Sequence, residues 1–146
     1  MLVLTWLACA SPEPIDLGEP WLELGAGQTA FEPLQDDDVV ELVAGPQGGW
    51  HVDVSVRFGG MWPDGVTLTY GAWLDDALVS FESSAQLSEN SVLVIDDGWE
   101  RVADRIVFDI AETSEVVGQT LELRLACTSE QGDLADVRQV ALVDEQ

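Results

Sequence analysis

Apolar and polar residues alternate along most of this chain. The clearest example is residues 50–58, in which apolar residues occupy the even positions and polar residues the odd positions. A repeat of two is typical of a β-strand with one face on a core and the other in solvent. A turn rich in proline and glycine, residues 45–49, leads directly into this strand. The pattern therefore predicts that His51 faces solvent at the start of a strand.

The same alternation predicts further strands along the chain. Asp75 and Asp76 separate two apolar runs, as expected for a hairpin with a short loop. Residues 92–95 form an unbroken apolar run, which is typical of a strand buried on both faces. Residues 83–91 and 111–117 are predicted loops. The remaining predicted strands are residues 21–25, 29–31, 39–43, 66–74, 77–81, 105–110, 120–127 and 135–143.

No segment has the periodicity of a long amphipathic helix. Short strands separated by turns at intervals of roughly ten residues indicate an all-β sandwich or barrel. A chain of 146 residues is long enough for one such domain with its own core. We therefore expect one β domain, which covers residues 21–144.

Two stretches carry a resemblance to known families. Residues 120–127, a Gly/Asp turn and residues 137–142 resemble the end of an immunoglobulin-like or fibronectin-like domain, in which Trp73 would be a core tryptophan. The stretch Gly-Pro-Gln-Gly-Gly-x-His at residues 45–51 resembles that of uncharacterised bacterial exported lipoproteins. These resemblances imply a single immunoglobulin-like antiparallel β-sandwich of about seven to nine strands. They imply no known activity.

The N-terminal segment has the composition of an export signal. Residues 1–10 read MLVLTWLACA, a run too short to span a bilayer. Leu7-Ala8-Cys9 resembles a lipobox and makes Cys9 the expected lipidation site, although Trp6 and the lack of a basic region depart from that pattern. Ala8-Cys9-Ala10 also fits ordinary signal cleavage. We expect residues 11–20 to form a flexible tether and the protein to be lipid-anchored in the outer membrane, the periplasm or the surface of a bacterium.

The charge excludes one large class of partners. The chain has 28 acidic residues, five arginines and no lysine, for a net charge of −23. Phosphate backbones require clustered cations, so we expect no nucleic-acid partner. An anionic membrane surface is also disfavoured, which leaves the lipid anchor as the membrane contact. Cations, basic proteins and neutral ligands remain compatible with this charge.

Two groups of residues are candidates for metal binding. His51 is the only histidine, and a zinc site needs three or four ligands, so we expect His51 to contact a ligand or simply to begin its strand. Acidic turns at Asp36-Asp37-Asp38 and Asp96-Asp97 offer oxygen ligands for a weak calcium site. Aspartate is common in turns for its own hydrogen bonding, and no EF-hand pattern is present. No other cofactor is expected.

Loop aromatic residues are candidates for ligand binding. Trp62 and Trp99 lie in predicted loops, near Asp64 and Asp97. Indole rings stack on sugar rings while carboxylates bind their hydroxyl groups, so these residues predict a glycan site. The alternative is that both indoles cover the ends of the core, because tryptophan is highly buried on average.

Catalytic motifs are missing from the sequence. It contains one histidine and no nucleophile elbow, phosphate-binding loop or metalloprotease motif. Paired carboxylates carry no weight in so acidic a chain. We therefore predict a non-enzymatic envelope protein that acts as a protein-interaction, adhesion or structural module. A carbohydrate-binding module that uses the loop tryptophans and a weak calcium-binding sandwich are the alternatives.

Overall fold

A computed structural model describes residues 16–145, and these residues form an all-β domain, as the sequence predicts. Apart from two 3₁₀ turns, η1 (Glu89–Ser91) and η2 (Thr113–Glu115), its regular elements are all strands. Within residues 16–145, no helix is long and apolar enough to cross a membrane. The strands are β1 (Trp21–Ala26), β2 (Glu32–Pro33), β3 (Asp38–Ala44), β4 (Trp50–Gly59), β5 (Thr67–Leu74), β6 (Ala77–Leu78), β7 (Ser83–Gln86), β8 (Leu93–Ile95), β9 (Gly98–Val107), β10 (Thr120–Ser129) and β11 (Gly132–Asp144).

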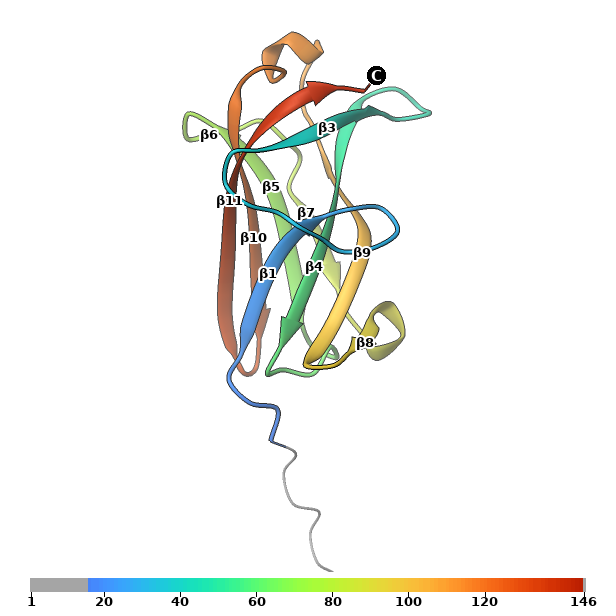
Figure 1. The fold of residues 1–146 in the computed structure, drawn as a ribbon, viewed down its shortest axis with the longest axis vertical. Coiled ribbons are helices and arrows are strands. Elements are labelled where there is room, and N and C mark those ends of the chain that lie inside the picture. The colour runs from blue at the N-terminus through green and yellow to red at the C-terminus, as the bar shows by residue number, and fades with distance from the viewer. Residues whose placement is uncertain (1–15, 146) are drawn as a thin grey trace, which may run out of the picture.

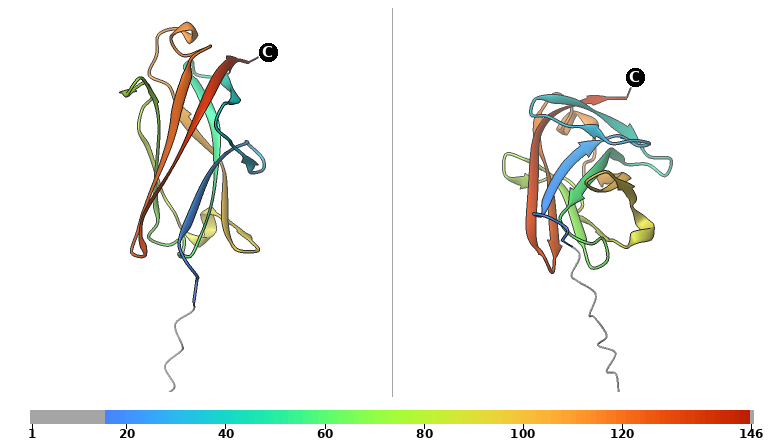
Figure 2. Two further views of the ribbon diagram at one scale, coloured as in Figure 1. Left: turned by 60° about the vertical axis from the view of Figure 1, so that its left-hand side comes forward. Right: turned by 60° about the horizontal axis from the view of Figure 1, so that its bottom comes forward.

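The strands form two facing layers, as Figures 1 and 2 show. One layer has the order β2-β1-β4-β9-β8, and the other contains β11, β10 and β5, with β6 and β7 both paired to β5. β3 belongs to both layers, because residues 38–42 pair in parallel with β11 while Val43 and Ala44 pair with β4. The two layers are therefore one continuous mixed sheet. The expected seven to nine antiparallel strands are corrected to eleven in the described residues, with one parallel pair.

On the side of the sandwich opposite β3, backbone hydrogen bonds from residues 79–81 also join the two layers. Val79 N–H donates to Ala72 of β5, and Asp109 N–H donates back to Val79. Phe81 N–H donates to the carbonyl of Val107 at the end of β9. These bonds replace most of the return strand predicted at residues 77–81, of which only Ala77–Leu78 is a named strand.

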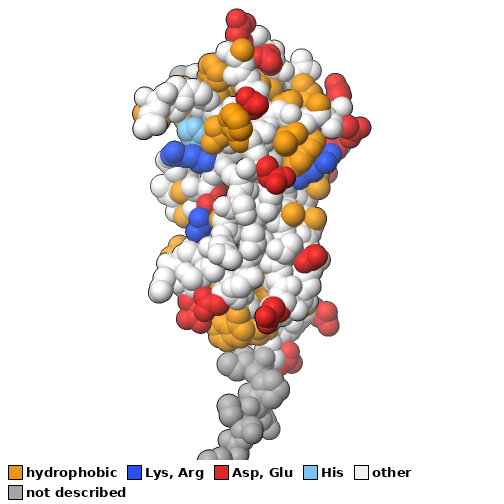
Figure 3. Space-filling view, turned by 180° about the vertical axis from the view of Figure 1, so that it is seen from behind, with side chains coloured by type: hydrophobic (Ala, Val, Ile, Leu, Met, Phe, Trp, Pro, Cys, Tyr) orange, Lys and Arg blue, Asp and Glu red, His pale blue; other side chains and the backbone are white. Residues whose placement is uncertain are grey.

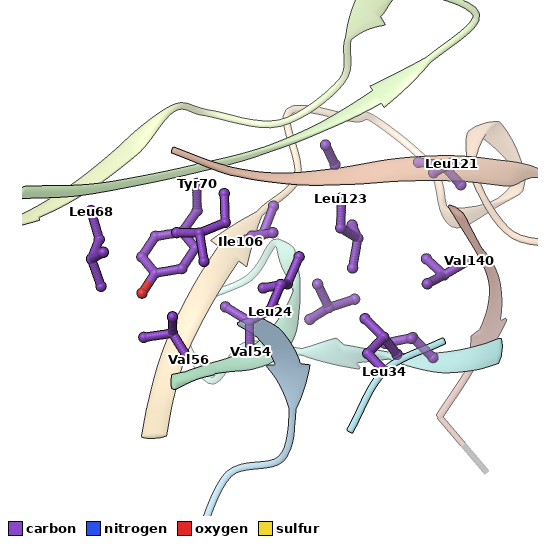
Figure 4. Packing of buried hydrophobic residues seen from close by; sticks show 14 of the residues in the cluster. Leu24, Leu34, Val54, Val56, Leu68, Tyr70, Ile106, Leu121, Leu123 and Val140 are labelled. Carbon is purple, nitrogen blue, oxygen red and sulfur yellow. The ribbon is translucent and has the colours of Figure 1, made fainter. Parts of the chain in front are cut away.

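The core lies between the layers and is built by alternating residues. On β10, the inward residues Leu121, Leu123, Leu125 and Cys127 are all buried, as the sequence predicts. They lie beside the even positions of β5 in the same layer and face the even positions of β4 in the other layer. Figure 4 shows Leu123, Tyr70 and Val54 directed into the same interior. Burying each such aliphatic side chain stabilises the fold by about 1.5–3 kcal/mol before entropy is counted.

The strand predicted at residues 29–31 is irregular chain that directly precedes β2. Four further local predictions need correction. Residues 92–95 form no doubly buried strand, because β8 is exposed and pairs only with β9. Residues 83–91 contain β7 and the turn η1 rather than a plain loop. Trp73 is not a core residue: it lies on the outer side of β5, where its ring contacts the Arg124 guanidinium at 4.4 Å. The fourth concerns β4, whose polar face is largely covered rather than in solvent.

The cover over β4 comes from the segment between β1 and β2. Phe31 in this segment packs against Gly25, where a Cβ would come within 2.4 Å of its ring. The Arg57 guanidinium also stacks on the Phe31 ring, 4.4 Å from its centroid. Ser55 becomes buried here and donates its hydroxyl hydrogen to the carbonyl of Ala26. Alternation along β4 cannot reveal this cover, because the cover is made by a distant segment.

Candidate functional site

Several predicted site residues meet at one end of the sandwich, which we call the N-terminal pole. At this end β1 begins, β4 ends and β9 begins, and the described chain enters there, as Figure 1 shows. Asp16 and Leu17 line a recess together with Gly60, Asp97 and Trp99. Residues 16–20, the second half of the predicted tether, contain no regular secondary structure. The predicted export segment and Cys9 lie outside the described residues.

Trp62 lies in the loop after β4, as predicted, whereas Trp99 lies on strand β9 rather than in a loop. The two indole rings contact each other at this pole. Their ring centroids are 5.7 Å apart and their planes make an angle of 45°. Trp99 is half-buried and donates its indole hydrogen to the Met61 carbonyl at 3.1 Å, whereas Trp62 is 37% exposed. The rings therefore form a stepped apolar surface rather than the flat platform that stacks on a sugar ring.

Strand β8 extends this apolar surface to the edge of the sheet. Val94 pairs with Trp99, which pairs in turn with the buried Phe58 of β4. The row of core side chains thus runs outward through Trp99 and ends at Val94, which is 78% exposed. Leu93, on the other face of β8, is 58% exposed. We call Trp62, Leu93, Val94 and Trp99 the pole surface.

Carboxylates surround the pole surface. Asp96 and Asp97 form the two-residue loop between β8 and β9, and Glu89 precedes β8 on η1. Asp64 lies beside η1 and accepts a hydrogen bond from the backbone of Glu89 at 3.1 Å. At the lower end of the molecule, Figure 3 shows an apolar cluster with acidic side chains on both sides of it.

The cations of β9 and its neighbour β4 are already paired. The Arg57 guanidinium lies 2.8 Å from the Glu100 carboxylate, and that of Arg101 lies 2.7 Å from Asp104. The acidic residues around the pole surface therefore create a negative field that these arginines do not cancel.

His51 lies at the opposite end of β4 from the pole, and it is buried rather than facing solvent. It is 6% exposed and lines a recess beneath the turn of residues 45–49, together with Arg105 and Val107. Within the described residues, its Nε2 has no hydrogen-bond partner and lies 3.6 Å from the nearest Asp53 oxygen. Desolvation by burial lowers the pKa of His51, and Arg105 acts in the same direction, while Asp53 and Glu145 oppose it. The structure thus separates His51 from the tryptophans.

The acidic turns predicted to bind calcium lie in different loops. In the first turn, Asp36 accepts a hydrogen bond from the Gln139 backbone at 2.9 Å, and Asp38 accepts one from Gln35 at 2.8 Å. Asp96 and Asp97 belong to the pole instead. Across residues 16–145, no three His, Cys, Asp or Glu side chains are grouped so that they could hold a metal ion. Turn hydrogen bonding accounts for the first cluster without an ion.

The sequence does not identify Leu93 and Val94 as exposed. An unbroken apolar run is compatible with a buried strand and with an edge strand, since periodicity says nothing about neighbours. The useful signal was the pair Asp96-Asp97, which marks residues 92–95 as one arm of a hairpin.

Comparisons with known proteins add little to this geometry. No family model matches the chain, and no curated protein matches it. Among solved structures, the chain is similar to the CooA pilin subunit from enterotoxigenic Escherichia coli, with a TM-score of 0.36 and 8% sequence identity. The match covers 86% of this chain and 99% of the pilin chain. Similarity at this level supports no conclusion about function.

Proposed function

We propose that this chain is a non-enzymatic protein-binding module displayed at the bacterial envelope and anchored through Cys9. The observation that carries the proposal is the pole surface, where Val94 is 78% exposed on a chain with a net charge of −23. Such a charge favours a well-solvated surface, so apolar side chains gathered at one end point to a partner that covers them. Their acidic surroundings favour a partner with positive charge.

The direction of the tether supports a partner close to the anchor. The described chain enters at the N-terminal pole, next to Trp99 and Asp97. A lipid at Cys9 followed by a short extended tether would hold this end of the domain near the membrane. Because the surrounding carboxylates disfavour an anionic bilayer, we assign the pole surface to a basic protein of the envelope rather than to lipid.

A glycan-binding function is less well supported. The indole planes of Trp62 and Trp99 are inclined at 45°, and the Trp99 N–H is already bonded to a backbone carbonyl. Both features differ from an open stacking platform, on which the two rings are coplanar and their N–H groups are free to bind a sugar.

Site-specific photocrosslinking in the native host tests the proposal. A photoreactive residue at Val94 should crosslink one defined envelope protein, and that protein, once purified, should bind the isolated chain. Leu78 of β6 is the matched control, because it is also an exposed aliphatic residue but lies at the other end of the molecule. Equal crosslinking from both positions, or none from Val94 in cells whose envelope contains the chain, would contradict the proposal. Mass spectrometry of the mature N-terminus tests the anchor, because an unmodified chain that begins at Ser11 excludes it.

A further inference from the structure

We infer that β8 binds its partner by strand addition, and that the added segment alternates apolar and cationic side chains. This inference rests on the proposed function, since it names the partner chemistry and the binding mode of the pole surface. It follows from three properties of β8: the direction of its free backbone groups, the exposure of both of its faces, and the charge around it.

The free edge of β8 presents the backbone groups of Val94. β8 and β9 are joined by a two-residue loop, and Ile95 pairs with Gly98 next to that loop. In such a hairpin the pair that flanks the loop exchanges both backbone hydrogen bonds, and the next pair exchanges none. The N–H and C=O of Val94 therefore point away from β9, toward the edge where no further strand is paired in the described residues. A new strand would bond to these two groups first.

Both faces of β8 offer apolar contacts to an added strand. Val94 shares its face with Trp99, and Trp99 contacts Trp62. Leu93 projects from the other face, beside Glu100 in the register of the hairpin. An added strand that alternates apolar and cationic residues would place its apolar side chains on the face of Val94 and Trp99. Its cationic side chains would lie on the face of Leu93, where their aliphatic stems contact Leu93 and their charges lie near Glu100.

Other short strands of the sheet are less suited to strand addition. β2 contains Pro33, which has no N–H to donate, and β7 is the polar segment Ser83–Gln86. β6 is apolar and exposed but has only two residues. Native proteins protect their sheet edges with prolines, charges or very short strands. β8 is short as well, but its own residues are all apolar and exposed or half-buried, which distinguishes it from β2 and β7.

Charge selects a cationic segment and disfavours a second copy of this chain. Asp96, Asp97 and Glu89 flank β8 at its two ends. Two copies that joined through β8 would bring these carboxylates together, on chains that each carry a net charge of −23. A segment with lysine or arginine next to its apolar residues would neutralise them instead, and its binding would weaken as salt increases.

A synthetic peptide tests strand addition on the whole chain. The probe is an extended peptide of alternating valine and lysine, and its controls replace lysine with glutamate or place a proline at its centre. We expect the lysine peptide to bind, to bind less tightly at high salt, and to slow hydrogen exchange of the Val94 amide. The proline and glutamate peptides should bind about ten-fold more weakly or not at all. No binding by the lysine peptide, equal binding by the glutamate peptide, or unchanged exchange at Val94 would overturn the inference.

Two variants at one position separate backbone pairing from side-chain contact. Val94→Pro removes the outward N–H without breaking a bond to β9, whereas Val94→Thr keeps both the N–H and the branched shape. Strand addition predicts that Val94→Pro weakens peptide binding about ten-fold and more than Val94→Thr does. If Val94→Pro melts like wild type and binds the peptide normally, the inference fails.

The crosslinked partner separates the two proposals. Loss of that partner in Val94→Pro supports both. If the partner is retained in Val94→Pro but lost in Val94→Asp, the pole surface binds through side chains alone. The proposed function then stands while strand addition fails. If neither variant affects the partner, both proposals fail.

Discussion

Tyr70 of β5 and Asp104 of β9 connect the two layers of the sandwich through a partly buried hydrogen bond. The Tyr70 hydroxyl donates to an Asp104 carboxylate oxygen at 2.6 Å. The same carboxylate accepts two hydrogen bonds from the Arg101 guanidinium, both at 2.7 Å. Burial and the Asp104 charge raise the pKa of Tyr70 above its usual range, so the hydroxyl remains a donor at every physiological pH.

A β-bulge in β9 places Asp104 within hydrogen-bonding distance of Tyr70 and places Arg101 beside Asp104. Val56 pairs with Arg101 and Val54 pairs with Asp104, so β9 has one residue more than β4 across this interval. Ala103 within the bulge has a φ of 62°, in the left-handed region. The extra residue shifts the alternation of β9, and both Arg101 and Asp104 therefore lie on the inner side of the sheet.

Removing the Tyr70 hydroxyl should destabilise the protein without disturbing its packing. In Tyr70→Phe, the ring remains in the core while Asp104 loses one hydrogen bond to its charged group. We expect the free energy of unfolding to fall by about 2 kcal/mol, since hydrogen bonds to charged groups contribute about 1.5–3 kcal/mol. Urea unfolding followed by tryptophan fluorescence measures this change, and a variant as stable as wild type would show that the bond contributes nothing.

Glycine in place of Ala103 in the bulge should stabilise the folded protein. Ala103 is exposed and has a φ of 62°, which is unfavourable for a residue with a Cβ. Ala103→Gly removes this strain, although the more flexible unfolded chain offsets part of the gain. We expect a net stabilisation of up to about 1 kcal/mol, seen as a higher melting temperature in calorimetry. Ala135→Gly is the control, because it replaces an alanine on β11 without a positive φ and should destabilise. A destabilised Ala103→Gly would contradict the strain argument.

The sequence predicts the parts of the fold that local alternation determines. The inward residues of β10 are buried as predicted, and so are Val52, Val54, Val56 and Phe58 of β4, because one face of each strand forms the core. The bulge was detectable in principle, since Trp99 and Ile106 share a face in the structure but have opposite parity in the sequence. The parallel pairing of β3 with β11 was not detectable, because it joins segments about 100 residues apart and leaves no local pattern.

The candidate site was only partly predictable for a related reason. The sequence predicts Trp62, Trp99 and Asp64 as loop residues. Trp99 lies on β9 instead, but the structure brings all three residues to the N-terminal pole. Exposure depends on neighbours that a single sequence does not identify. Thus Val94, in an apolar run, is exposed at a sheet edge, while His51, in a polar position, is covered by its own turn.

Cys127 should be unreactive in the folded protein. It is buried on β10 with its sulfur 3.7 Å from that of Met61, and burial, together with the Asp133 charge, raises the pKa of its thiol to about 11. The thiolate is the reactive form, so alkylation at pH 8 should be slow in native protein and fast in urea. Mass spectrometry of a Cys9→Ser chain measures this reaction at a single thiol. Rapid labelling without denaturant would show that this part of the core opens readily.

His51 should make stability depend on pH in the neutral to mildly acidic range. Burial lowers its pKa below the usual 6.5, and the neighbouring groups are Asp53, Arg105 and Glu145. Below pH 6.5 the unfolded chain binds a proton that native His51 does not, so the free energy of unfolding falls as the pH decreases from about 7 to about 5. His51→Gln, measured by urea unfolding over the same range, keeps the contribution of the carboxylates and removes that of the imidazole. Its stability should therefore fall less steeply than that of wild type. Parallel curves of unfolding free energy against pH for the two proteins would show that the pKa of His51 is the same in the folded and unfolded chain. A steeper loss of stability in the wild type assigns that extra loss to the buried imidazole.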